Sequence, residues 1–121
     1  MRTTIAALAA TFFVVIAGFA LPQDPVPLSP QMYTVLLDNE HVRVLEFRCK
    51  PGDKEPMHAH PAMVAYSLTA SKFRSTTRDG ETTAGETKPG TAEWAEAVTH
   101  AWECLGPGEQ RTIITELKGV R

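Results

Sequence analysis

Residues Gly52 to Pro61 read Gly-Asp-Lys-Glu-Pro-Met-His-Ala-His-Pro and contain two of the four histidines of the chain. His58 and His60 are one residue apart, so on a β-strand both side chains point to the same side, because side chains there alternate with a period of two. A third histidine, His100, lies further along the chain. If the fold places His100 opposite this pair, three imidazoles share one space and form most of a metal site.

The rest of the chain after residue 32 reads as short strands separated by turns. Strands are predicted where β-branched, aromatic and alternating apolar residues occur, at 33–37, 42–49, 57–60, 64–68, 72–77, 82–87, 91–94, 100–105 and 112–117. Turn pairs such as Pro51-Gly52, Asp79-Gly80 and Pro89-Gly90 separate them. The one helical candidate, 92–99, is short and uncapped. The pattern predicts an all-β, antiparallel sandwich or barrel in a single domain.

The first twenty residues have the composition of an export signal. One basic residue, Arg2, precedes an uncharged apolar run, and Gly18 and Ala20 place small residues before a cleavage point after Ala20. We expect a signal peptide at 1–20, a secreted or periplasmic protein, and no stable membrane insertion after cleavage; an uncleaved anchor is the alternative. Residues 21–32 contain four prolines and predict an extended lead-in, and the barrel is expected at 33–119.

Charge and composition indicate which partners are expected. Loss of Arg2 leaves 11 basic against 14 acidic residues, without a basic cluster. Nucleic acid is therefore not an expected partner, and a small molecule or a second copy of the chain is favoured.

The spacing around the histidines resembles the motifs of the cupin superfamily, a family of small jelly-roll β-barrels. Gly52, five residues and then His58-Ala59-His60-Pro61 are similar to its first motif, and Pro89-Gly90 followed by His100 is similar to its second. The resemblance covers residues 33 to 118 and is to the small single-domain members. It implies a jelly-roll barrel, a metal held by His58, His60 and His100, and a homodimer.

Two departures change what the resemblance implies about the site. Val64 and Ala65 stand where the family places a glutamate ligand, and Cys104 stands where it places an asparagine. Three neutral imidazoles still suit a divalent transition metal such as iron, zinc, nickel, copper or manganese. Without a carboxylate ligand the ion keeps its double charge, which favours an anionic ligand. Glu103 is not expected to replace it, because strand parity places it opposite to the face of His100.

Apolar residues near these histidines are candidates for the lining of a pocket. We predict that Met57, Tyr66 and Trp102 contribute to it, with Phe47 and Trp94 as further candidates; the alternative is that each is simply core. His41 is interpreted as a surface residue.

The two cysteines, Cys49 and Cys104, are expected to form a disulfide in an exported protein. In a jelly roll the strand that ends at Cys49 pairs with the last strand, and the His58 strand pairs with the His100 strand, so the sulfurs should meet at one end of the barrel. The alternative is that Cys104 is a thiolate ligand or a redox group.

The sequence leaves three functional interpretations open. One is a metal-dependent oxygenase or isomerase that acts on a small organic molecule. The second is a non-catalytic barrel that binds a metal or a small ligand, and the third is a structural barrel with a decayed metal site. No catalytic residue beyond the metal ligands is indicated, since no serine or cysteine stands in a recognisable nucleophile arrangement.

Overall fold

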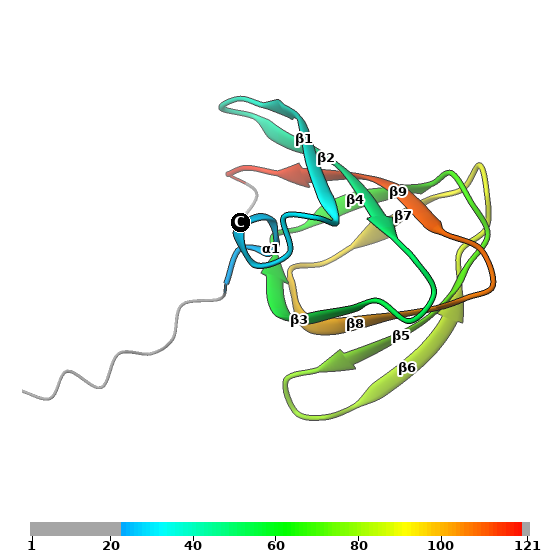
Figure 1. The fold of residues 1–121 in the computed structure, drawn as a ribbon. Coiled ribbons are helices and arrows are strands. Elements are labelled where there is room, and N and C mark those ends of the chain that lie inside the picture. The colour runs from blue at the N-terminus through cyan, green and yellow to red at the C-terminus, as the bar shows by residue number, and fades with distance from the viewer. Residues whose placement is uncertain (1–22, 120–121) are drawn as a thin grey trace, which may run out of the picture.

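The computed structural model describes residues 23–119, which form one short helix and two antiparallel sheets that face each other (Figure 1). The elements are α1 (Pro25–Leu28), β1 (Tyr33–Asp38), β2 (Val42–Cys49), β3 (Lys54–His60), β4 (Met63–Ser67), β5 (Lys72–Thr77), β6 (Thr82–Glu86), β7 (Ala92–Ala95), β8 (Val98–Gly106) and β9 (Gln110–Leu117). The predicted all-β fold is confirmed, and the segment 92–99 contains β7 and the start of β8, with a break at Glu96 and Ala97 between them, rather than a helix.

The strand order is that of a jelly roll. One sheet has the order β1-β2-β9-β4-β7 and the other the order β3-β8-β5-β6. The two pairings expected for a jelly roll are both present: β2 runs antiparallel to β9, and β3 runs antiparallel to β8. In the second pair His58 lies directly opposite His100. The topology therefore brings together the histidines that the sequence separates.

The interior lies between the two sheets and follows from alternation along each strand. In β9 every second residue from Gln110 to Glu116 is buried, as a strand with one face on the core requires. The buried apolar cluster consists of Met32, Tyr33, Leu45, Phe47, Cys49, Met63, Cys104 and Ile114. The buried polar residues include His58, His60 and His100. The interior of the barrel thus contains a cluster of apolar side chains and a set of buried polar side chains.

A β-bulge in β3 determines which of its residues face inward. Glu55 pairs with Trp102 and His58 pairs with His100, so Pro56 and Met57 together face a single residue, Ala101. A bulge tolerates proline, which has no N–H to give to the ladder. Because the extra residue reverses the parity, Glu55 is buried at 3 % exposure. Met57 is 37 % exposed, so the prediction that it lines the pocket is wrong.

The proline-rich segment before β1 is ordered and partly helical, which corrects the expectation of an extended lead-in. Pro25 begins the single turn of α1, where a missing N–H costs nothing. Asp24 caps the turn by accepting a hydrogen bond from the Val26 N–H at 3.0 Å. The Gln23 carbonyl accepts a hydrogen bond from the Ala59 N–H at 2.9 Å. The segment therefore covers the free edge of β3.

Replacing Asp24 with alanine should lower the free energy of unfolding by about 1–2 kcal/mol, because it removes both the cap of α1 and a partly exposed ion pair with Arg43. Urea denaturation measures this change. Asp38→Ala is the matched control, since Asp38 pairs with Lys118 but caps no helix, and its loss should be smaller. Equal losses in the two variants would show that the α1 cap contributes nothing.

The predicted signal peptide, 1–20, lies outside the described residues. Within residues 23–119 no helix has the length and apolar character to cross a membrane.

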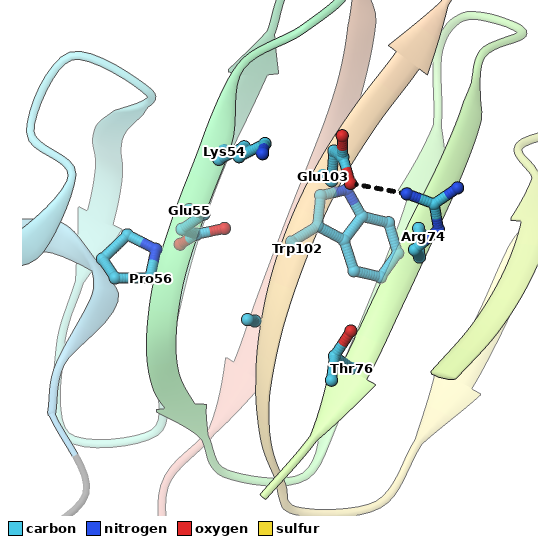
Figure 2. Close-up of a pocket in the computed structure, with 8 residues that line it drawn as sticks. Lys54, Glu55, Pro56, Arg74, Thr76, Trp102 and Glu103 are labelled. Atoms are coloured by element: carbon cyan, nitrogen blue, oxygen red, sulfur yellow. Dashed lines mark hydrogen bonds and ion pairs between the residues drawn. The ribbon is translucent and has the colours of Figure 1, made fainter. Parts of the chain in front are cut away.

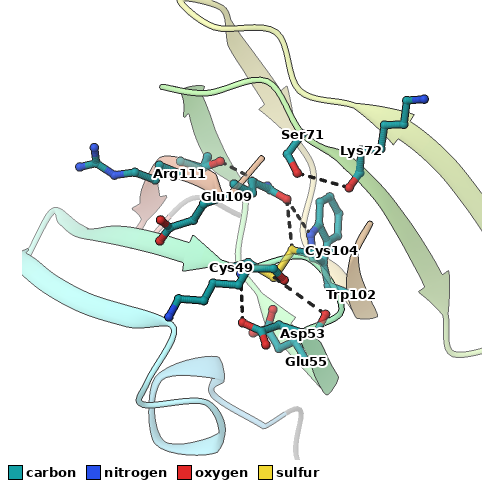
Figure 3. Close-up of a disulfide and its surroundings, with 12 residues drawn as sticks. Cys49, Asp53, Glu55, Ser71, Lys72, Trp102, Cys104, Glu109 and Arg111 are labelled. Atoms are coloured by element: carbon teal, nitrogen blue, oxygen red, sulfur yellow. Dashed lines mark hydrogen bonds between the residues drawn. A yellow bond between two sulfur atoms is a disulfide. The ribbon is translucent and has the colours of Figure 1, made fainter. Parts of the chain in front are cut away.

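Cys49 and Cys104 form a disulfide, with their Cα atoms 6.1 Å apart (Figure 3). Cys49 ends β2 in the five-stranded sheet and Cys104 lies on β8 in the four-stranded sheet, so the bridge ties the two sheets together at one end of the barrel. Cys104 is completely buried. Because its sulfur is in this bond, the alternative of a thiolate metal ligand is excluded. A disulfide is typical of proteins in oxidising compartments.

Candidate metal centre

His58, His60 and His100 converge between the sheets. One ring nitrogen from each lies within 4.8 Å of the other two, and the three residues are 1 %, 5 % and 8 % exposed. His58 and His60 come from β3, on the same face as expected for residues two apart, and His100 comes from the paired position on β8. The predicted juxtaposition of three imidazoles is therefore present in the fold.

Each ring has its Nδ1 atom engaged by a different partner. His58 Nδ1 lies 2.8 Å from the Pro56 carbonyl oxygen, which the bulge turns toward it. His60 Nδ1 lies 2.8 Å from Oε2 of Glu116, and His100 Nδ1 lies 3.1 Å from the hydroxyl of Ser75. A histidine that donates from Nδ1 carries its lone pair on Nε2, so these contacts favour Nε2 as the free atom of each ring.

A chain of charged groups connects His60 to the surface. Glu116 accepts from His60 on one oxygen and from Arg43 Nε at 2.5 Å on the other. Arg43 in turn donates to both carboxylate oxygens of Asp24, at 2.8 and 3.0 Å. Burial alone would raise the pKa of Glu116, but the hydrogen bonds from His60 and Arg43 outweigh it and hold that pKa below its usual range. Glu116 is thus an ionised carboxylate behind a candidate ligand, an arrangement common in metal sites.

Burial determines the protonation of the other two histidines. It lowers the pKa of His58 to about 4 and the pKa of His100 to about 3, and the neighbouring imidazoles add to the effect at His100. Both rings are therefore neutral near pH 7, which is the form that binds metals.

One buried nitrogen atom in this cluster lacks a hydrogen-bond partner within residues 23–119, and this atom indicates that the residues suit a metal. Nε2 of His58 is buried and has no hydrogen-bond partner in the described residues. A buried polar atom without a partner costs roughly 1–3 kcal/mol, so it needs an explanation. The three imidazoles at this place are a donor set that suits a transition metal and leaves coordination positions open. The residues present therefore fit a divalent metal.

A second buried carboxyl lies next to the cluster. Glu55 accepts a hydrogen bond from the Tyr33 hydroxyl at 2.5 Å, and the same oxygen is 3.4 Å from His58 Nδ1. Burial raises the pKa of Glu55 to about 7, against the opposing effect of the Tyr33 hydrogen bond. The group is thus poised between its charged and neutral forms near neutral pH.

Changes in these pKa values predict how the stability of the metal-free protein depends on pH. Between about pH 4 and 6.5 the unfolded chain protonates His58 and His100 while the folded protein does not, so stability rises with pH. Glu55 acts in the opposite sense between about pH 4.5 and 7, because the folded protein keeps a proton that the unfolded chain loses. His58 and His100 together have a larger effect than Glu55 alone, so the free energy of unfolding should rise with pH over this range.

Thermal unfolding in the presence of a chelator, at several values between pH 4 and 7, measures this rise in the melting temperature. In Glu55→Gln the rise should be steeper, because the opposing group is removed. A melting temperature that stays constant or falls from pH 4 to 6 would contradict the burial of neutral histidines.

A cavity of about 100 Å³ lies beside the histidines. Trp102, which was predicted to line it, does so, and its ring stacks on Phe73 with centroids 4.1 Å apart. Gly85 makes room for this wall, because a Cβ atom there would lie 2.6 Å from Cζ of Phe73. Phe47 also lines the cavity.

Tyr66 was predicted to line this cavity, and the structure corrects that prediction. It is 42 % exposed and is not among the lining residues, whereas Met63, Ala65 and Ser67 of the same strand are. On the inward face of β4, Ala65 and Ser67 have small side chains. They leave the space that the cavity occupies.

Glu103 lies on the outer face of the four-stranded sheet, as strand parity predicts. It accepts a hydrogen bond from Arg74 at 2.9 Å (Figure 2). Lys54 and Thr76 lie on the same side of the sheet around a shallow surface depression. Glu103 therefore does not supply a ligand to the histidines.

Comparison with solved structures shows which known folds this chain resembles. A cupin domain from Bordetella pertussis Tohama I is 27 % identical and superposes with a TM-score of 0.65 over 72 % of this chain and 92 % of that chain. A cupin family protein with a double-stranded β-helix fold from Methanocaldococcus jannaschii is 14 % identical, with a TM-score of 0.58 over 71 % and 78 % of the two chains. This chain has the double-stranded β-helix fold of the cupin superfamily.

A further structural neighbour has a named activity. A polyketide cyclase from Streptomyces resistomycificus is 22 % identical, with a TM-score of 0.54, over 70 % of this chain and 63 % of that chain. Neither the comparison with protein-family models nor that with curated proteins gives a match.

Several polar residues of this site were not found by sequence reasoning. Glu116 lies two residues after Ile114 on the last strand, so strand alternation places both side chains on the same inward face of β9. The sequence could therefore have indicated a buried charged residue at this position. Glu55 could not be found by parity, because the bulge at Pro56 reverses it. Arg43 and Asp24 come from segments with no motif, and only the fold brings them together.

Proposed function

We propose that this chain binds one divalent transition metal through Nε2 of His58, His60 and His100. The observation that carries the proposal is that all three Nδ1 atoms are engaged by other groups while Nε2 of the buried His58 has no partner. The buried, ionised Glu116 supports it, because a carboxylate on Nδ1 increases the basicity of the opposite nitrogen.

The chemistry of such a site would be metal-assisted conversion of a small organic molecule. A bound divalent ion supplies Lewis acidity, and a redox-active ion also supplies oxygen activation. The protein holds His58 and His100 neutral and fixes the orientation of the three rings from behind through Pro56, Glu116 and Ser75. Phe47, Phe73 and Trp102 give the cavity beside them an aromatic wall. An oxygenase or an isomerase is the reaction class that we propose.

A non-catalytic barrel that binds a metal or small ligand is the alternative. It is favoured by the absence of a carboxylate among the grouped ligands, since the cluster in the described residues contains histidines only. The likeness to a polyketide cyclase supports a small organic ligand rather than a particular reaction. We further propose that the protein is exported, which agrees with the disulfide.

Elemental analysis of the purified protein after loading with iron, zinc, nickel, copper or manganese tests the proposal. About one ion per chain is expected for the wild type, because the chain offers one group of three buried histidines. His58→Ala and His100→Ala should lose the ion. His41→Ala is the matched control, because the His41 side chain is 78 % exposed and lies outside the cluster.

The outcome separates the interpretations. Absence of metal from the loaded wild type, or equal metal content in the three variants, would overturn the proposal. Metal binding without oxygen uptake or isomerisation, with a panel of small acids, diketones and phenols, would favour the non-catalytic barrel.

A further inference from the structure

An outer chamber of about 410 Å³ leads to the histidines between the edge strand β7 and β8. The chamber and the inner cavity share a set of lining residues, Met63, Ala65, Glu93, His100 and Trp102. Because His100 belongs to both, a ligand in the chamber can reach the proposed metal ligands without a change of fold. The chamber therefore adjoins the site.

The charged groups of this chamber have one sign. Its remaining lining residues are Trp94, Ala95, Glu96, Ala97 and Val98. Two carboxylates, Glu93 and Glu96, thus face a space whose lining, within residues 23–119, contains no lysine or arginine. A cleft lined by one sign of charge repels ligands of that sign and attracts the other. The rest of the wall is apolar, and Trp94 and Trp102 offer aromatic surface to a ligand.

Glu93 is the carboxylate that is available to a ligand. It pairs with Ala65 across β7 and β4, so it stands next to a small residue at the mouth of the inner cavity. Glu96 accepts a hydrogen bond from the Trp94 ring N–H at 2.8 Å. Within residues 23–119 the side chain of Glu93 has no hydrogen bond or ion pair (Figure 1 shows its strand, β7, at the sheet edge).

Resting on the proposed function, we propose that the ligand is a small, uncharged molecule with an apolar or aromatic body and a weakly acidic O–H group, and not a carboxylate. It passes Glu93 and Glu96 as a neutral molecule. At the histidines its O–H bond breaks, the electron pair stays on the ligand oxygen, and the proton goes to the carboxylate of Glu93 and then to solvent. A divalent ion at the histidines would favour an anionic ligand, whereas the carboxylates at the entrance disfavour one. A ligand that enters neutral and loses its proton at the histidines satisfies both conditions.

Two probes with the same aromatic body test this charge selection. Benzohydroxamic acid is neutral near pH 7 and has an acidic O–H group, whereas benzoate is an anion. Each is titrated into zinc-loaded wild type, Glu93→Gln and Glu81→Gln, and the affinity is expressed per loaded site after metal analysis. Glu81 lies in the turn between β5 and β6, outside the chamber lining, and serves as the matched control.

Wild type should bind benzohydroxamic acid and exclude benzoate. Glu93→Gln should bind benzoate about tenfold more tightly than wild type does and should gain nothing for benzohydroxamic acid, because one repelling charge is gone. Glu81→Gln should behave as wild type. Equal benzoate affinity in wild type and Glu93→Gln, or tighter benzoate binding by wild type than by Glu93→Gln, would overturn this inference while leaving the metal site intact. Failure of the wild type to load zinc would instead overturn the proposed function and this inference with it.

Discussion

Replacing Glu116 with glutamine should weaken metal binding about ten- to a hundredfold. Glu116 accepts the Nδ1 proton of His60 at 2.8 Å and is held in place by Arg43. Its negative charge increases the electron density on Nε2 and fixes the tautomer that presents this atom to a metal. Glutamine keeps the shape but loses the charge. A competition titration of Zn²⁺ against a chromophoric chelator measures the change in the dissociation constant.

Glu109→Gln is the matched control for this experiment. Glu109 is also paired with an arginine, Arg48 at 3.0 Å, but it has no contact with a histidine. Its metal affinity should equal that of the wild type. Since Glu116→Gln also leaves Arg43 with only Asp24 as its partner, circular dichroism should first verify that the variant is folded. An unchanged zinc affinity in folded Glu116→Gln would contradict the role assigned to this carboxylate.

Removal of the disulfide should lower the free energy of unfolding by about 4 kcal/mol, because the bridge closes a long loop in the unfolded chain. The two cysteines are 55 residues apart and join the two sheets. The loss is a large share of the stability of a small domain, which is typically about 5–15 kcal/mol. Urea denaturation of wild type and of the double variant Cys49→Ala/Cys104→Ala measures it.

Reduction provides an independent comparison. Wild type treated with a thiol reductant should unfold at a lower urea concentration, whereas the double variant should be insensitive to the reductant. Wild type and double variant with the same midpoint and slope would contradict the stabilising role of the bridge.

The sequence predicted the framework of the fold, because strands and turns leave local signals. Alternation in β2 and the turn at Pro51-Gly52 gave the strand that ends at Cys49, and the observed bounds agree with it. The pairing of β3 with β8 then followed from jelly-roll topology, and with it the meeting of His58 and His100. The disulfide followed from the same reasoning and is present.

The inward-facing residues were harder to predict than the strands. In β4 the larger apolar residues, Val64 and Tyr66, face outward, and Ala65 and Ser67 face the cavity. Alternation of apolar residues shows that a strand has two different faces. It does not show which face points toward an internal cavity, where small side chains are needed. In β3 the bulge at Pro56 moves Met57 outward and Glu55 inward, a change that strict alternation cannot represent.

The groups behind the histidines depend on tertiary structure alone. Asp24, Arg43 and Glu116 come from the helix cap, β2 and β9, and they become one chain of ion pairs only after folding. The prolines before β1 suggested an extended spacer, but a proline at the first helical position and the aspartate cap form a turn there. The part of the site that could be predicted was therefore its ligands, and the part that could not was their support.

Anomalous X-ray diffraction from crystals of the zinc-loaded protein, collected on both sides of the zinc absorption edge, tests the central claim most directly. One strong anomalous peak is expected about 2.0–2.1 Å from Nε2 of each of His58, His60 and His100. A zinc peak bound to other groups, to Nδ1 atoms, or to fewer than three of these histidines would contradict it.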